Sequence, residues 1–217
     1  MMKMKKISKI FKIIVLLLFF LSILISFLAV KLGYEYYKNH EDEIKIEEFY
    51  KEQEELVEDN KEIVSEELTE KQIKNYNTEK YIAVLKIPKI NLERGLYEKN
   101  SPLNSVDKNI QIIKESNYPN VDKGNFILAA HSGVGKIAYF NDVKNLEKED
   151  EIMVIFNGNQ YLYKVSNKYE VDKTGQIEIV RDITKTTLTL TTCKHNTDKQ
   201  IVVIAELQEI NKYEGGI

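Results

Sequence analysis

The chain is poor in several residue types that usually carry a structural or chemical role. It has no tryptophan, three prolines, one cysteine (Cys193) and, among 31 basic residues, only two arginines (Arg94 and Arg181). A single cysteine excludes a disulfide within the chain and the usual cysteine-rich zinc site. The net charge of -3 gives no global reason to expect nucleic acid, and no nucleic-acid partner is expected.

The amino-terminal residues 1–12 are basic, and the stretch after them is strongly apolar. Residues 13–30 carry no charge and are interrupted only by Ser22 and Ser26. With its flanks this run reaches the roughly 20 residues that span a bilayer as a helix, and it is longer than the apolar part of a cleaved signal peptide. We therefore expect an uncleaved transmembrane anchor over residues 13–32. The positive-inside rule predicts a single-pass protein of the cell membrane, with residues 1–12 in the cytoplasm and the rest outside.

Residues 33–80 differ in composition from the remainder of the chain. Acidic residues and lysines dominate this stretch, which has no proline and few apolar residues. Several of the apolar residues recur at three, four or seven positions, as on one face of a helix. The composition predicts an acidic extracellular stalk, either mostly helical or a disordered linker.

A β-rich domain is predicted over residues 81–217. Short runs of β-branched and aromatic residues alternate there with turn residues. Asn157-Gly158-Asn159 is a strong hairpin signal between two of the runs. The strands are expected at residues 81–87, 91–97, 125–130, 151–156, 160–170, 186–192 and 200–207. Many short strands with few helices favour a closed barrel or a sandwich.

A cysteine and a histidine each follow directly after a predicted strand. Cys193 comes after Thr187–Thr192 and before a polar loop, and His131 comes after Ile127–Ala130. Strand ends of a barrel present side chains to a mouth or groove. There a thiolate can act as a nucleophile, and an imidazole can stabilise it and deliver a proton near neutral pH. A small, buried, unreactive cysteine is the alternative that composition alone favours.

Four segments, in this order along the chain, resemble the motifs of sortases. They are Ile87-Pro88-Lys89-Ile90 (I-P-x-I), Ala129-Ala130-His131-Ser132-Gly133 (around the sortase histidine), Ala138–Leu146 with Asp150-Glu151-Ile152 (aromatic-N-x-L-x-x-L-x-x-G-D-x-I) and Thr189-Leu190-Thr191-Thr192-Cys193 (T-L-x-T-C). Order, spacing and the amino-terminal anchor all agree, over roughly residues 81–207. On this resemblance the chain is identified as a member of the sortase family.

The resemblance implies a mainly β fold, an eight-stranded sortase-type β-barrel with short helices, and a cysteine transpeptidase activity. Cys193 would attack a backbone carbonyl in the C-terminal sorting signal of another exported protein, and His131 would act as general acid for the leaving amine. An amine of a peptidoglycan cross-bridge or of a pilin lysine would then resolve the thioacyl enzyme and attach the surface protein. No cofactor and no metal are expected.

The chain departs from the family pattern at the arginine that sortases usually carry at the start of the last strand. Gln200 falls at that position, beside Lys199. A glutamine amide can donate to an oxyanion but lacks the charge and the bidentate fork of arginine. Only one of the two can face Cys193, because neighbouring strand residues point to opposite faces. Gln200 is the favoured replacement. Lys199, or neither residue, is left open, as is access of Arg94 or Arg181 to the groove.

The remaining expectations concern single residues, the subclass and the rival functions. Thr192 is expected to bind substrate, with a packing role as its alternative, and His195 is expected to be a loop residue. About fifteen residues over 170–185 are few for the helix-bearing insertion of class B, so a class A or D type is favoured. The rivals are a catalytically weak, sortase-fold surface-binding module and an L,D-transpeptidase. The latter is disfavoured because Thr-Leu-Thr-Thr precedes the cysteine.

Overall fold

The computed structural model describes the backbone of residues 2–62 and 80–215. The chain divides into two compact units, Met1–Ile44 and Lys45–Ile217. The long helix α1 (Met2–Glu62) contributes to both units. Residues 33–62 of the predicted stalk are therefore helical, whereas residues 63–79 lie outside the described part of the chain.

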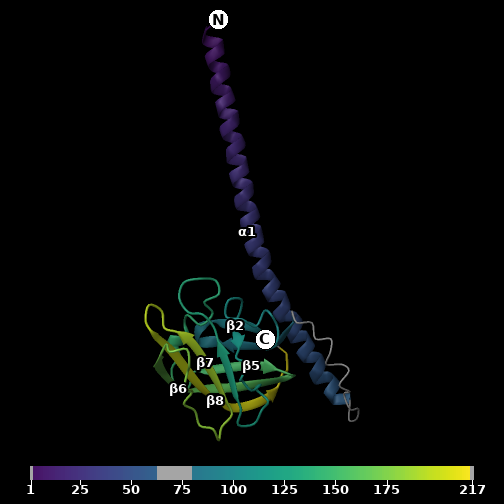
Figure 1. Cartoon of the computed structure of the whole chain (residues 1–217). Coiled ribbons are helices and arrows are strands. Elements are labelled where there is room, and N and C mark those ends of the chain that lie inside the picture. Colours follow the sequence, from purple (N-terminus) through teal and green to yellow (C-terminus); the bar gives the residue numbers. More distant parts are fainter. Residues whose placement is uncertain (1, 63–79, 216–217) are drawn as a thin grey trace. The chain divides into compact units, whose positions relative to one another are not determined.

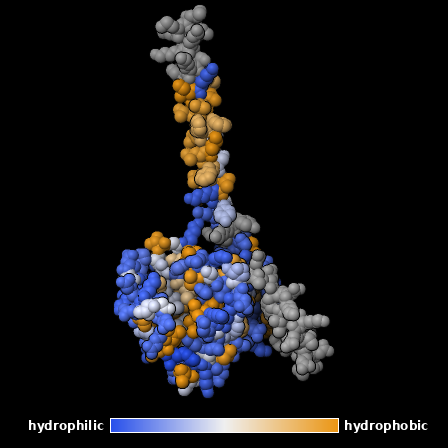
Figure 2. All heavy atoms as spheres, viewed as in Figure 1, coloured by the Kyte–Doolittle hydropathy of each residue, from blue (hydrophilic) through white to orange (hydrophobic). Residues whose placement is uncertain are grey.

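Within the first unit, α1 carries a continuous band of apolar side chains (Figure 2). The large hydrophobic side chains between Phe11 and Val30 are all exposed. Among the described residues this is the one helix long and apolar enough to cross a membrane. A helix that cannot bury such a band in protein needs an apolar solvent for it. The segment therefore fits a single-pass membrane anchor.

The second unit is a sheet of eight strands with two short 3-10 helices. The strands are β1 (Tyr81–Ile87), β2 (Leu92–Tyr97), β3 (Gln111–Ile112), β4 (Asn125–Ala129), β5 (Glu151–Phe156), β6 (Asn159–Asp172), β7 (Thr187–Cys193) and β8 (Lys199–Lys212), and the 3-10 helices are η2 (Pro88–Ile90) and η3 (Val143–Asn145). All seven predicted strands are present. The two-residue β3 has no counterpart among the predictions because it is too short to show alternation.

The sheet has the strand order β2-β1-β5-β6-β8-β7-β4-β3, and it curls around one interior (Figure 1). Every neighbouring pair is antiparallel except β4 and β7, which are parallel. The edge strands β2 and β3 approach each other through the buried side chain of Asn109. Its amide donates to the Gly95 carbonyl at 2.8 Å, and its oxygen accepts from Arg94 Nε at 2.9 Å. The result is a nearly closed barrel, as expected for the fold class.

Side chains alternate between the two faces of each strand, and those that point inward fill the interior of the barrel. The side chains that point inward include Leu85 of β1, Val154 of β5, Leu190 of β7 and Val203 of β8, all fully buried. Each such aliphatic side chain contributes about 1.5–3 kcal/mol by leaving water. Gly158 allows the tight turn from β5 to β6, because it and Asn157 both have positive φ angles, of 71° and 50°.

A second apolar cluster lies on the outer face of the barrel, where α1 residues from Lys45 onward pack against it. Phe49 is 2% exposed and packs with Tyr81, Tyr97 and Ile155. Gln53 is also buried, and its Oε1 accepts a hydrogen bond of 2.6 Å from the backbone N–H of Gly158. Of the two forms predicted for the stalk, residues 45–62 have the helical one, and apolar residues among the charges pack this part of the helix against the barrel.

Candidate active site

Cys193 and Gln200 are paired across two neighbouring strands, and His131 stands just beyond the end of a third. Ala129 of β4 lies opposite Thr191 of β7, and His131 and Cys193 each come two residues later in the sequence. Across the other edge of β7, Cys193 is paired directly with Gln200 of β8. Directly opposed residues of neighbouring strands project from the same face. The pairing therefore places Cys193 and Gln200 side by side and brings the end of β4, two residues before His131, to the end of β7, although the three residues span 69 positions of the sequence.

The backbone after β4 is tied to β7 and to its own loop. The Ser132 hydroxyl donates a hydrogen bond to the carbonyl of Cys193, and the Phe140 N–H donates to the carbonyl of His131 at 3.0 Å. These bonds close the loop 132–140 over the end of the strand. They hold the backbone of His131 beside that of Cys193 even though β4 has ended at Ala129.

The imidazole of His131 has an acidic neighbour that the sequence did not single out. Nε2 of His131 lies 3.2 Å from Oδ1 of Asp107, with the histidine side chain 43% exposed and the aspartate 80% exposed. A carboxylate in this place orients the ring and favours the N–H on Nε2.

Cys193 is partly exposed and ends β7 at the margin of a cavity of about 270 Å³. Phe140, Thr192 and Ile201 contribute to the wall of this cavity, and Lys144 and His195 lie at its polar side. A buried, unreactive cysteine, the alternative from composition, does not agree with this exposure. No group of three metal-ligating side chains occurs near it or elsewhere in the described residues.

Gln200 and Lys199 are distinguished by their partners. The ammonium of Lys199 forms an ion pair with Asp172 of β6, on the face opposite to that of Cys193. The Oε1 atom of Gln200 is buried and has no hydrogen-bond partner among the described residues. An unpaired buried amide oxygen lowers the free energy of unfolding by about 1–3 kcal/mol. At a functional site, such an atom often forms its hydrogen bond with a bound ligand. The amide can turn by half a rotation and present its NH₂ group instead.

Both arginines have partners other than His131, Cys193 and Gln200. Arg181 donates to the backbone carbonyls of Asp182, Lys185 and Lys123 at 3.0–3.3 Å. Arg94 donates to Asn109, and its guanidinium lies 4.6 Å from the ring centre of Tyr139. Arg181 thus organises the loop before β7, and Arg94 stiffens the seam between β2 and the loop after His131.

Thr192 and His195 flank the cysteine in different ways. Thr192 is 4% exposed, and its hydroxyl donates to the carbonyl of Ala130 at 2.8 Å. This bond ties β7 to β4 and agrees with the packing role, while Thr192 also borders the cavity. His195 is exposed in the β7–β8 loop and lies against Gly133, where a Cβ atom would come within 2.9 Å of its Nδ1. His195 is thus a loop residue, as expected.

Three side chains of this site could not be predicted from the sequence. Asp107 stands in a loop 24 residues before His131, and no spacing rule links the two. Ser132 and Asn141 act through the backbone, because Ser132 binds the Cys193 carbonyl and Asn141 Oδ1 accepts from the N–H of Gly133 at 3.2 Å. The resemblance covers Ser132 and Asn141 within its motifs, which is the one signal that marks their segments.

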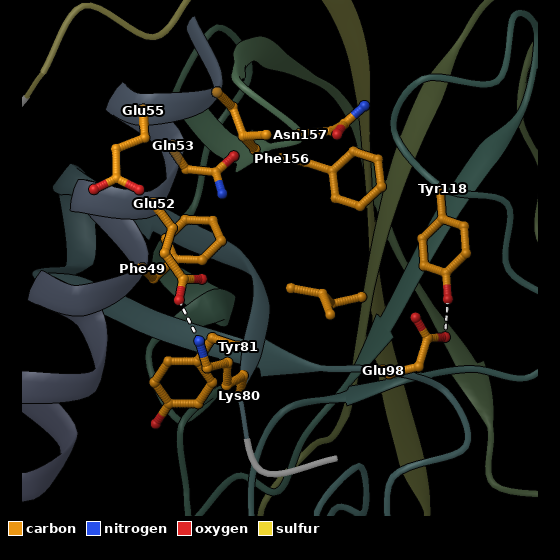
Figure 3. Close-up of a pocket in the computed structure, with 12 residues that line it drawn as sticks. Phe49, Glu52, Gln53, Glu55, Lys80, Tyr81, Glu98, Tyr118, Phe156 and Asn157 are labelled. Atoms are coloured by element: carbon orange, nitrogen blue, oxygen red, sulfur yellow. Dashed lines mark hydrogen bonds and ion pairs between the residues drawn. The ribbon is translucent and has the colours of Figure 1, made fainter. Parts of the chain in front are cut away.

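A larger cavity, of about 450 Å³, lies at the other end of the barrel (Figure 3). Aromatic rings of Phe49, Tyr81, Tyr118 and Phe156 line it, and the last two are stacked 5.5 Å apart. Figure 3 shows Lys80 paired with Glu52, and Tyr118 donating to Glu98. Burial and the bond to Glu98 raise the pKa of Tyr118. This cavity is the larger of the two, but Cys193 lines the smaller one and not this one.

A model of the sortase domain matches residues 85–208, which is more than half of the chain. The chain belongs to the sortase family. It is 32% identical to Sortase A of Bacillus anthracis over 128 residues, which is 56% of this chain and 57% of that protein. It is 29% identical to Sortase D of Bacillus subtilis (strain 168) over 110 residues, 51% of this chain and 52% of that one. The sortase chain thus spans little more than half the length of the curated relatives that it matches.

Solved sortases have the same fold. A Listeria monocytogenes sortase A superposes with a TM-score of 0.52 at 21% identity, over 61% of this chain and 90% of that one. A Clostridium perfringens Sortase D5 transpeptidase gives a TM-score of 0.53 at 22% identity, over 64% of this chain and 86% of that one. At these identities the comparison establishes the barrel. The chemistry has to be argued from the residues of this chain.

Proposed function

We propose that this sortase-family protein is a cysteine transpeptidase of class A or D type that acts on the C-terminal sorting signals of exported proteins. The observation that supports the proposal is the pairing of Cys193 of β7 with Gln200 of β8, with His131 two residues past the end of β4, the other neighbour of β7. A nucleophile, a proton carrier and an oxyanion donor are the three groups that acyl transfer requires.

The first half of the reaction forms a thioester. The thiolate of Cys193 attacks the scissile carbonyl carbon, so that a C–S bond forms and the C–N bond breaks. His131 gives its proton to the departing amine, and Asp107 holds the ring for that transfer. The Gln200 amide, turned so that its NH₂ group faces the carbonyl oxygen, stabilises the negative charge that develops there.

The second half returns the enzyme to its starting state. A neutral amine attacks the thioester carbon, a new C–N bond forms, and the C–S bond breaks to release the thiolate. The proton lost by the amine returns to His131. The acceptor is an amine of a peptidoglycan cross-bridge or of a pilin lysine. Retention of the acyl group as a thioester preserves its reactivity for transfer.

The proposal includes the predicted placement of the chain in the cell. Residues 13–32 anchor it, residues 1–12 face the cytoplasm, residues 33–80 form the spacer, and residues 81–217 hold the catalytic machinery outside the cell of a Gram-positive-type organism. The contact of Phe49 and Gln53 with the barrel means that part of the spacer is a structural element of the folded unit. Thr192 is retained in the proposal as a residue that borders the substrate.

Mass spectrometry of the detergent-solubilised full chain, incubated with a small library of sorting-signal peptides, tests the proposal. We expect a peptide adduct on Cys193 that disappears when an amine is added. Cys193→Ala abolishes the adduct, and His131→Ala slows its formation about 10²–10⁴-fold. A reactive Cys193 that forms no adduct with any peptide of the library would instead favour the surface-binding module, which the missing arginine supports.

A further inference from the structure

We infer that the cavity beside Cys193 receives the acceptor amine, and that the acceptor carries a free carboxylate next to this amine, held by Lys144. The inference rests on the proposed transpeptidation and narrows its second substrate. It distinguishes an amino acid-like acceptor from a lysine side chain, since the ε-amine of a lysine within a protein has no carboxylate beside it.

The position of the cavity favours the acceptor over the sorting peptide. It is enclosed between two loops, the one that follows His131 and the one that joins β7 to β8, and Cys193 is part of its wall. Its volume of about 270 Å³ is near the lower limit of small-molecule sites, and it is too small for a peptide of several residues. A small amine fits such a space.

The cavity wall carries basic side chains and no acidic one. Its nine lining residues include Lys144 and Lys194 and neither an aspartate nor a glutamate. The ammonium of Lys194 is paired with Glu170 at 2.7 Å. The ammonium of Lys144 has no hydrogen-bond or ion-pair partner in the described part of the chain, and Asp142 nearby accepts from the amides of Asn141 and Asn145. Lys144 is therefore the cation that remains for an anionic ligand.

The same wall favours the reactive form of an amine. Phe140 and Ile201 are buried apolar residues of the cavity, so an amine placed there loses water. Desolvation and a nearby cation both disfavour the ammonium form and favour the neutral nucleophile. A carboxylate on the acceptor compensates for the cation, and it orients the amine toward the thioester in the way that a fixed ion pair orients a substrate.

Glycine and glycinamide are a matched pair of probes for this site, because they differ only in the charge next to the amine. The full chain in detergent is first acylated with a sorting peptide, and the transfer rates to the two amines are expressed as a ratio. The ratio is measured for the native chain, Lys144→Gln and Lys148→Gln. The intrinsic reactivities of the two amines are the same in every variant, so they cancel when the ratios are compared.

We expect Lys144→Gln to lower the ratio of glycine to glycinamide transfer roughly fivefold, the effect of losing one partly exposed charge pair. High salt should lower the native ratio in the same direction. Lys148→Gln, an exposed lysine of the same loop outside the cavity, should leave the ratio at its native value.

The outcomes separate the two proposals. An unchanged ratio in Lys144→Gln, with thioacyl enzyme formed and resolved normally, overturns the carboxylate inference and leaves the transpeptidase intact. An equal fall in Lys144→Gln and Lys148→Gln also overturns it, because the effect would then be one of general charge. Failure of the native chain to form any thioacyl adduct overturns the proposed function and the inference with it.

Discussion

The two ends of the barrel serve different purposes, and β8 connects them. β8 starts beside Cys193, at Lys199 and Gln200, and it ends beside Asn159, next to the place where α1 packs. The Cys193 end has partly exposed polar groups, an unpaired amide oxygen and loops held by a few hydrogen bonds. The α1 end has buried aromatic rings and a buried glutamine that binds the backbone.

The two ends differ in what their side chains do. Reactive groups need access to substrate, so the Cys193 end keeps polar atoms available at a cost in stability. The α1 end holds none of the candidate reactive groups, and Phe49 and Gln53 are buried there beside a cavity of about 450 Å³. Changes at the α1 end should therefore alter stability with little effect on turnover, and changes at the Cys193 end should do the opposite.

The largest effect is expected from a substitution that removes packing at the α1 end. Phe49→Ala removes a ring that is 2% exposed, so the free energy of unfolding should fall by about 3–5 kcal/mol. Thermal unfolding of the full chain in detergent, followed by circular dichroism, measures it. Leu56→Ala on the same helix is the control, because this side chain is 41% exposed and should cost much less. If both variants unfold like the native chain, the α1 segment contributes nothing to the barrel.

The next largest effect is expected on kcat, from a substitution at the Cys193 end. Gln200→Ala should reduce kcat for thioacyl formation roughly 10²-fold, as the loss of an oxyanion donor does, with no large change in stability. Gln200→Arg should retain activity, because a guanidinium can donate from the same place. Lys199→Ala is the control, since its ammonium is paired with Asp172 on the other face. A kcat of Gln200→Ala within twofold of native would remove Gln200 from the mechanism.

The smallest effect concerns the orientation of His131. Asp107→Asn should lower kcat a few-fold, while the KM for peptide stays unchanged. The effect is small because the pair of Asp107 with His131 is largely exposed to solvent. Asp107→Glu should restore part of the loss, and the alkylation rate of Cys193 should follow kcat across the three proteins. Equal changes in kcat and KM would point to a local structural role for Asp107 in place of a positioning one.

Much of the fold and half of the site could be predicted from the sequence. The alternation of side chains places β1 and β5 at the residues where they occur, and the Asn157-Gly158 turn joins β5 to β6. Cys193 and His131 are predicted because they stand in motifs that resemble those of sortases, and each follows a predicted strand. Asp107 and the cavity around Lys144 are not predicted, because they depend on loops whose course is set by tertiary contacts such as that of Ser132 with Cys193.

The sequence by itself determined the local features of this sortase: an apolar run long enough for a membrane, the strand pattern, a lone cysteine after a strand and a glutamine where arginine is usual. These are properties of neighbouring residues. Only the tertiary structure decided which distant residues share a face, because strand pairing and register set that. The parallel pairing of β4 with β7 brings the end of β4, two residues before His131, to the end of β7, and the antiparallel pairing of β7 with β8 brings Gln200 to Cys193. The packing of Phe49 makes part of a charged helix belong to the barrel.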